Sequence, residues 1–155
     1  MEQPVFNEHN KQEYPPMHTA EHIINRAMIN IFGCGRSVEA HIERKKSKLD
    51  YLLTAQPSEQ QIDKLTEMVN SVIDSHADVT VEFATQSEVA SRFNLDRLPE
   101  GASEQVRIVH VGDFDECLCI GAHVANTREI GHFVIVSHSW DEQTKIWRLR
   151  FKLAE

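Results

Sequence analysis

Apolar residues recur at helical spacing in two segments of the chain. Across residues 17–32 they follow the period of an amphipathic helix, and the pattern stops at Gly33, a residue typical of the left-handed position after a helix. Across residues 57–76 the same period returns, and Ser58 with Gln61 forms the sequence pattern of a capping box. The sequence therefore predicts two long helices, each with an apolar face that a sheet must cover.

Alternation of apolar and polar residues predicts strands in the rest of the chain. Two segments are expected to pair across a basic turn: 37–43 and 48–54. Four further segments have the composition of strands: 78–85, 105–112, 131–138 and 145–153. The second and third of these four are expected to be inner strands, whereas in the last one basic residues alternate with apolar ones and face water. A short helix is predicted over 86–95, and a turn over 98–101.

These elements favour a single domain, residues 1–155, of the α+β class. We expect a mostly antiparallel sheet packed by two long helices in two layers. With 41% hydrophobic and 26% charged residues, the chain is long enough to bury a core of its own. No apolar run approaches the roughly 20 residues that span a bilayer, and the N-terminal segment lacks the features of a secretory signal. We therefore expect a cytoplasmic protein that does not enter a membrane.

The formal charge of −8 argues against a protein that grips nucleic acid over its whole surface, because phosphate binding normally uses clustered lysine and arginine. A contact with phosphate would have to be local. The first candidate cluster lies in the predicted basic turn and consists of Arg44, Lys45, Lys46 and Lys48. A second lies near the C-terminus and consists of Arg148, Arg150 and Lys152. The alternative for both clusters is a solvated face without a partner.

Two pairs of metal-binding residue types share a spacing of four. His18 and His22 lie on one face of the first predicted helix, one turn apart, and Cys119 and His123 lie between two late strands. One thiolate and three imidazoles form a suitable ligand set for zinc. Cys117 is an alternative to Cys119 because alternate residues of a strand face the same way. Either pair alone is weak evidence, since partly exposed histidines are common in a first helical turn.

The other cysteines and histidines show no such pattern. Three cysteines, one of them Cys34, do not make a disulfide framework. Five further histidines are interpreted as surface or core residues: His41, His76, His110, His132 and His138.

The motifs "HTAEH" and, about 100 residues later, "CIGAHVANTREIG" resemble the HxxxH and CxxxH signature of alanyl-tRNA editing proteins in their short free-standing form. These proteins are relatives of the editing domains of alanyl- and threonyl-tRNA synthetases. The likeness also covers the two long helices and the "LPEG" turn before "VRIVHV". The chain departs from the CGGTH form of the second motif at Ile120 and Ala122, and Arg128 stands where glycine is common.

The resemblance implies a trans-editing hydrolase, which cleaves the ester joining serine or glycine to alanine tRNA. It implies that His18, His22, Cys119 and His123 hold zinc, and that the partner is the acceptor end of a mischarged tRNA. We expect Lys45 and Lys46 of the first basic cluster to touch phosphate.

Two further residues are candidates for the chemistry. Glu129, in the "TREIG" turn, is a candidate for orienting the site, and Ser37 for recognising the serine hydroxyl. Glu21 points about 100° away from His22 on a helix and is expected to be solvated.

The sequence leaves the mechanism and the class of function open. Four protein ligands close a tetrahedral zinc, which would then anchor or polarise the substrate by expanding its shell or losing a ligand; with three ligands, zinc would generate hydroxide directly. The competing functions are a zinc-stabilised module that binds nucleic acid or protein without hydrolysis, and a zinc hydrolase of another aminoacyl ester. The sequence does not determine the oligomeric state.

Overall fold

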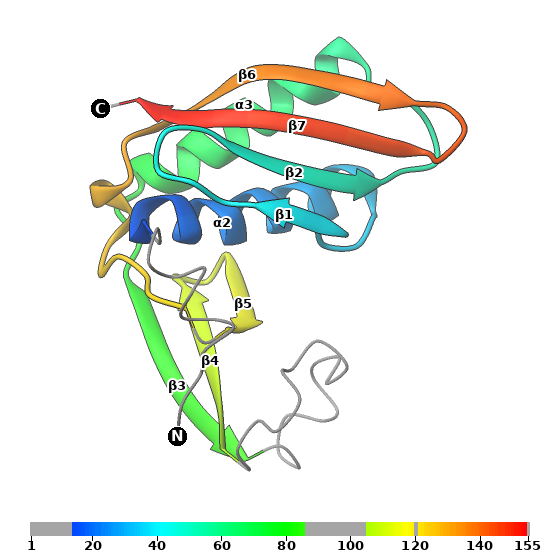
Figure 1. The fold of residues 1–155 in the computed structure, drawn as a ribbon. Coiled ribbons are helices and arrows are strands. Elements are labelled where there is room, and N and C mark those ends of the chain that lie inside the picture. The colour runs from blue at the N-terminus through cyan, green and yellow to red at the C-terminus, as the bar shows by residue number, and fades with distance from the viewer. Residues whose placement is uncertain (1–13, 86–104, 120, 155) are drawn as a thin grey trace.

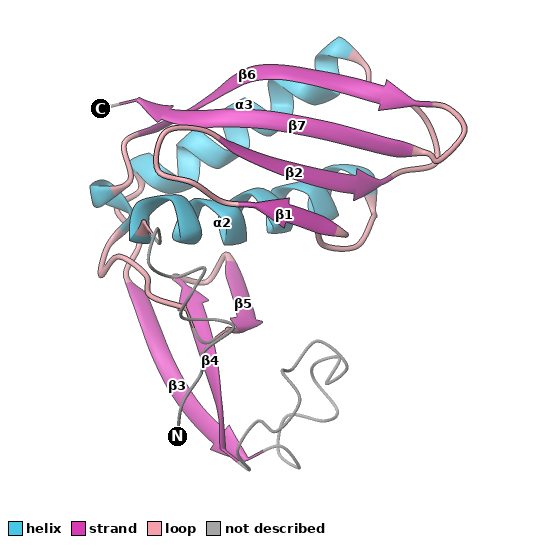
Figure 2. Ribbon diagram, in the orientation of Figure 1, coloured by secondary structure: helices cyan, strands magenta, loops and turns pink. Residues whose placement is uncertain are grey.

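The computed structural model of the chain describes residues 14–85, 105–119 and 121–154, without the side chains of 105 and 106. These residues contain two α-helices, one short 3-10 helix and two antiparallel sheets, which confirms the predicted α+β class (Figures 1 and 2). The short helix expected over 86–95, the turn expected over 98–101 and the departure at Ile120 lie outside the described residues.

The larger sheet has four strands in the order β1-β2-β7-β6. Their bounds are Glu39–His41 for β1, Ser47–Leu52 for β2, Ile146–Ala154 for β7 and His132–Asp141 for β6. The expected pairing across the basic turn is confirmed, since β1 and β2 are antiparallel neighbours. The expectation of an inner strand over 131–138 is wrong: β6 lies at the edge of the sheet, and β7 takes the inner place between β2 and β6. The apolar composition of a strand does not distinguish an edge strand from an inner one here, because helix α3 also packs against the edge strand β6.

The smaller sheet has three strands in the order β3-β4-β5. They span Val79–Thr85, Gln105–Val111 and Asp115–Leu118. The central place of β4 confirms the inner strand expected over 105–112. Strand β5 was not predicted, and neither was the division of the strands between two sheets, because four residues are too few to show an alternation.

Both long helices are present close to their predicted bounds. Helix α2, Pro15–Phe32, starts with two prolines and ends at Gly33, whose φ of 68° is the left-handed conformation expected there. Helix α3, Glu59–Asp74, starts at the predicted capping box, with the Ser58 and Gln61 side chains each bonding the backbone of the other. Both helices lie on one face of the larger sheet (Figure 1).

Helix α2 is buried on two sides. One side carries apolar residues that join the core between the helices and the larger sheet: Met17, Ala20, Ile23, Ile24, Ala27 and Met28. The other side carries the buried polar residues Thr19, His22 and Asn25, and its neighbours include the end of β5. Of the residues of α2, Asn30 alone is exposed. The helix therefore separates an apolar core from a polar interior, and the candidate site lies in that interior.

No helix among the described residues has the length and apolar content needed to span a bilayer.

Candidate metal centre

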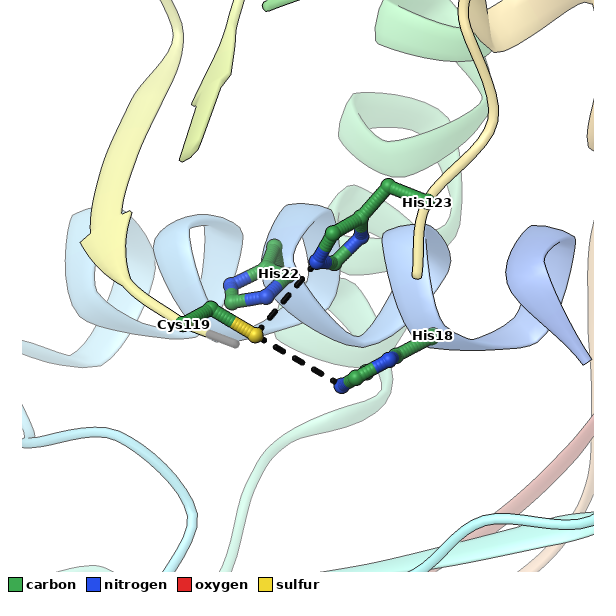
Figure 3. Close-up of side chains that lie close together, drawn as sticks. All are labelled: His18, His22, Cys119 and His123. Atoms are coloured by element: carbon green, nitrogen blue, oxygen red, sulfur yellow. Dashed lines mark hydrogen bonds between the residues drawn. The ribbon is translucent and has the colours of Figure 1, made fainter. Parts of the chain in front are cut away.

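The two predicted half-sites meet beside helix α2. His18 and His22 project from the helix, Cys119 follows directly after β5, and His123 lies in the loop that leads to the short 3-10 helix η2, Thr127–Glu129 (Figure 3). One ligand atom from each of these four residues lies within 4.8 Å of the others. The convergence is between residues about 100 positions apart in the sequence.

Two of the distances between ligand atoms fit a tetrahedral zinc ion. Ligand atoms 2.0 to 2.3 Å from a tetrahedral zinc lie roughly 3.3 to 3.8 Å from one another. Cys119 Sγ lies 3.4 Å from His123 Nε2 and 3.8 Å from His18 Nε2. Both ring nitrogens of buried His22 are without a hydrogen-bond partner among the described residues, which is costly unless another group binds one of them. The donor set therefore suits zinc.

Thr19 fixes the ring of His123. Its buried hydroxyl oxygen lies 3.0 Å from His123 Nδ1 and accepts a hydrogen bond of 3.1 Å from the backbone N–H of Val124. When His123 Nδ1 carries the ring proton and donates a hydrogen bond to Thr19, the lone pair of Nε2 faces Cys119 and the other ligand atoms. A metal-binding histidine commonly has such a partner on its second nitrogen.

A buried carboxylate lies behind His22. Asp115 Oδ1 accepts hydrogen bonds from Arg26 Nε at 2.9 Å and from Arg36 at 2.7 Å, and its second oxygen lies 3.8 Å from His22 Nδ1. Asp115 begins strand β5, so these ion pairs tie helix α2 to the strand that leads to Cys119.

Burial controls the protonation of the ligands. It lowers the pKa of His123 from 6.5 to about 3, helped by the neighbouring His18 and Arg107. Burial also lowers the pKa of His22 well below its ordinary value, with His123, His18 and Arg36 adding to the effect. The pKa of the Cys119 thiol is raised to about 12, again mainly by burial. In the metal-free protein at pH 7, His22 and His123 are therefore neutral and Cys119 is a thiol.

Gly121 allows the second half-site to approach the first. A Cβ atom at this position would overlap the imidazole ring of His18. Glycine is therefore required here by a close approach, and the departures from CGGTH at the neighbouring positions leave this glycine in place.

Comparison with known proteins agrees with the motifs. Residues 106–150 match the family described as threonyl and alanyl tRNA synthetase second additional domain. The chain is 34% identical over 123 residues to the alanine–tRNA ligase of Fervidobacterium nodosum and 33% identical over 136 residues to that of Staphylothermus marinus. It is 31% identical over 123 residues to that of Halalkalibacterium halodurans. The chain is related to the editing domains of these synthetases.

The relationship covers most of the chain and a small part of each relative. The alignments span 79% to 85% of this chain but only 14% to 15% of the length of the three ligases. The family match includes Cys119 and His123, whereas His18 and His22 lie before it.

Glu129 and Ser37, the two candidates for the chemistry, both take part in hydrogen bonds that involve backbone N–H groups. Glu129 Oε2 accepts the N–H groups of Ala125 and Asn126 at 3.2 and 3.1 Å, so its carboxylate stabilises the loop that follows His123. Ser37 is buried, and its N–H donates to Asn25 Oδ1 at 3.2 Å. Contact of either side chain with a substrate stays a prediction.

Glu21 differs from its expectation. Its side chain is 17% exposed, and Oε1 lies 3.9 Å from His18 Nε2. The prediction of a solvated residue was wrong because it compared Glu21 with His22 alone; the i,i+3 spacing to His18 places the two side chains on one helical face.

The other residues singled out in the sequence lie away from the four ligands. Lys45, Lys46 and Lys48 line a groove beside β7, while Arg44 stacks on the ring of Tyr14. Three histidines pair with carboxylates: His41 with Glu43, His110 with Glu82 and His132 with Asp74.

Proposed function

We propose that this chain is an aminoacyl-tRNA deacylase, which hydrolyses the ester that joins serine or glycine to alanine tRNA. The observation that carries the proposal is the convergence of His18, His22, Cys119 and His123 in a chain related to alanyl-tRNA synthetase editing domains. In this proposal the four side chains hold zinc. A role in translation fidelity would place the protein in the cytoplasm.

The reaction is ester hydrolysis. The oxygen of a water molecule bonds to the carbonyl carbon, the bond from that carbon to the ribose oxygen breaks, and the ribose oxygen takes up a proton. Zinc, when bound, supplies a Lewis acid that polarises the carbonyl or activates the water. The remaining work is done by positioning, because an aminoacyl ester is already activated.

The residues of the chain have separate tasks in this scheme. Thr19 orients His123, and Glu129 holds the loop that follows it, so both act on the geometry of the ligands. Glu21 presents a carboxylate beside His18 and is suited to receive the α-ammonium group of the aminoacyl ester. Ser37 is our candidate for recognising the serine hydroxyl, since rejection of alanine requires a polar group that alanine leaves unpaired.

The test compares deacylation of serine-charged and alanine-charged alanine tRNA by the wild type and by Cys119→Ala, with zinc content measured for both. Cys117→Ala is the matched control, because Cys117 lies two residues away and outside the cluster of four. We expect rapid hydrolysis of the serine ester alone, lost together with zinc in Cys119→Ala and retained in Cys117→Ala.

A second candidate function rests on the ligand count. Four protein ligands are typical of structural zinc sites, which stabilise a fold and leave no open position. Full zinc occupancy in the wild type without hydrolysis of either ester would contradict the deacylase proposal and favour a metal-stabilised binding module.

A further inference from the structure

A basic groove lies between the β1–β2 loop and strand β7. It has a volume of about 330 Å³ and is lined by His41, Glu43, Lys45, Lys46, Ser47, Lys48 and Arg150. The antiparallel register of β2 and β7 places Lys48 directly opposite Arg150. The groove therefore combines three lysines of the first basic cluster with one arginine of the second.

Among the described residues, no carboxylate forms an ion pair with the cations of this groove. Lys45, Lys46, Lys48 and Arg150 form no ion pair with any residue that the structure describes. By contrast Arg148, two residues before Arg150, makes a two-point contact with Asp50 at 2.9 and 3.0 Å. The one carboxylate of the groove, Glu43, contacts His41. In a chain with a formal charge of −8, four cations around one groove that have no ion pair within the described ranges favour an anionic ligand.

The loop that carries the lysines has a fixed shape. The hydroxyl of buried Ser47 accepts the N–H of Glu43 at 2.9 Å and donates to the carbonyl of the same residue at 3.1 Å. A loop that is already ordered loses less conformational entropy when it binds a ligand.

The same loop is attached to the helix that carries the metal centre. The guanidinium of Arg44 lies 4.7 Å from the centroid of the Tyr14 ring, and the carbonyl of Tyr14 accepts the N–H of His18 at 3.1 Å. In Figure 1 the β1–β2 loop accordingly lies at the N-terminal end of α2. Arg44 thus connects the loop to the helix at Tyr14, which lies one helical turn before His18, the first metal-ligand candidate.

We infer that this groove binds backbone phosphates of the tRNA, with Lys45, Lys46, Lys48 and Arg150 as the phosphate-binding cations. The inference rests on the proposed function for the identity of the ligand. A tRNA held there would have its chain close to the start of α2, while its 3′-terminal ester lies at the metal centre. Arg150 is the residue that the sequence did not connect with the lysines.

The test measures equilibrium binding of uncharged alanine tRNA between 50 and 200 mM salt, without any hydrolysis. The variants are Lys45→Ala/Lys46→Ala and Arg150→Ala, and the matched control is Lys64→Ala, an exposed lysine of α3 outside the groove. Each lost phosphate contact lowers the slope of log affinity against log salt by about 0.9. For the double variant, the ratio of wild-type to variant affinity is expected to fall roughly tenfold over this salt range. Arg150→Ala should lower the slope by about half as much as the double variant does, and Lys64→Ala should leave the slope unchanged.

Equal affinities and slopes for the wild type and both groove variants would overturn the inference, even if the chain deacylates its substrate. Failure of the wild type to bind tRNA at 50 mM salt would overturn it as well. Weakened binding in the groove variants alone would support it, also in a chain that shows no deacylation. The inference and the proposed function therefore fail on different measurements.

Discussion

Raising the pH from 7.5 to 8.5 is expected to tighten zinc binding about tenfold. Zinc binds the thiolate of cysteine, and burial raises the pKa of the Cys119 thiol to about 12, so the thiol keeps its proton over this whole range in the metal-free protein. Burial lowers the pKa of His22 and His123, so these two rings are already neutral.

The magnitude follows from the proton count. One proton leaves for each zinc that binds, so the affinity changes tenfold for each pH unit, which corresponds to about 1.4 kcal/mol. The affinity is measured by competition with a chelator of known zinc affinity at several pH values. Calorimetry in two buffers with different ionisation enthalpies gives the number of protons released, which should be about one.

A flat affinity between pH 7.5 and 8.5 would refute this reasoning, because it would mean that Cys119 is ionised before zinc arrives or does not bind it. A slope of two would show that a second ligand must also lose a proton. Cys117→Ala is expected to keep the slope of one, and Cys119→Ala is expected to bind zinc weakly and without that slope.

Two further predictions concern the surroundings of the four ligands. Thr19→Val keeps the shape of the side chain but removes the hydroxyl that meets His123 Nδ1. It is expected to lower zinc affinity roughly 10- to 100-fold in the same competition assay, while Thr19→Ser restores the affinity. Equal affinities for the two variants would count against a positioning role. The metal-free protein is expected to lose stability in acid, because the folded state holds the pKa of His123 near 3 and the unfolded state near 6.5, so that the unfolded state binds more protons as the pH falls below 6.5. From pH 7.5 to 4.5 this group contributes a loss of up to about 2.7 kcal/mol in the free energy of unfolding, measured by urea denaturation, and His123→Gln should flatten the dependence; an equally steep dependence in that variant would contradict the assignment.

The helices could be predicted because their signals are local. The period of apolar residues and the capping pair Ser58 and Gln61 act within a few residues of one another, and both helices occur close to the predicted bounds. Strand β5 and the edge position of β6 depend on which segments pair across the chain, and no pattern within those segments records that choice.

In the candidate site, too, residues with a local signal could be predicted and residues that depend on distant contacts could not. Spacing within each half-site identified His18, His22, Cys119 and His123, which the fold brings together. Thr19 and Asp115 were missed because each contacts a residue about 90 to 100 positions away, and neither residue type is distinctive in its own segment. The sequence places Arg150 in a second basic cluster on the water-facing side of a strand, and only the pairing of β2 with β7 brings it opposite Lys48.

The two-sided burial of α2 has a consequence for the lifetime of a bound metal. His18 and His22 belong to a helix in which Asn30 alone is exposed, so the helix cannot fray at the surface and release its ligands one at a time. Opening it means separating it from the larger sheet, the smaller sheet or both, which costs far more free energy than the movement of a loop. Release of a bound metal would therefore begin at Cys119 and His123, which lie in no helix or strand, while His18 and His22 stay in place.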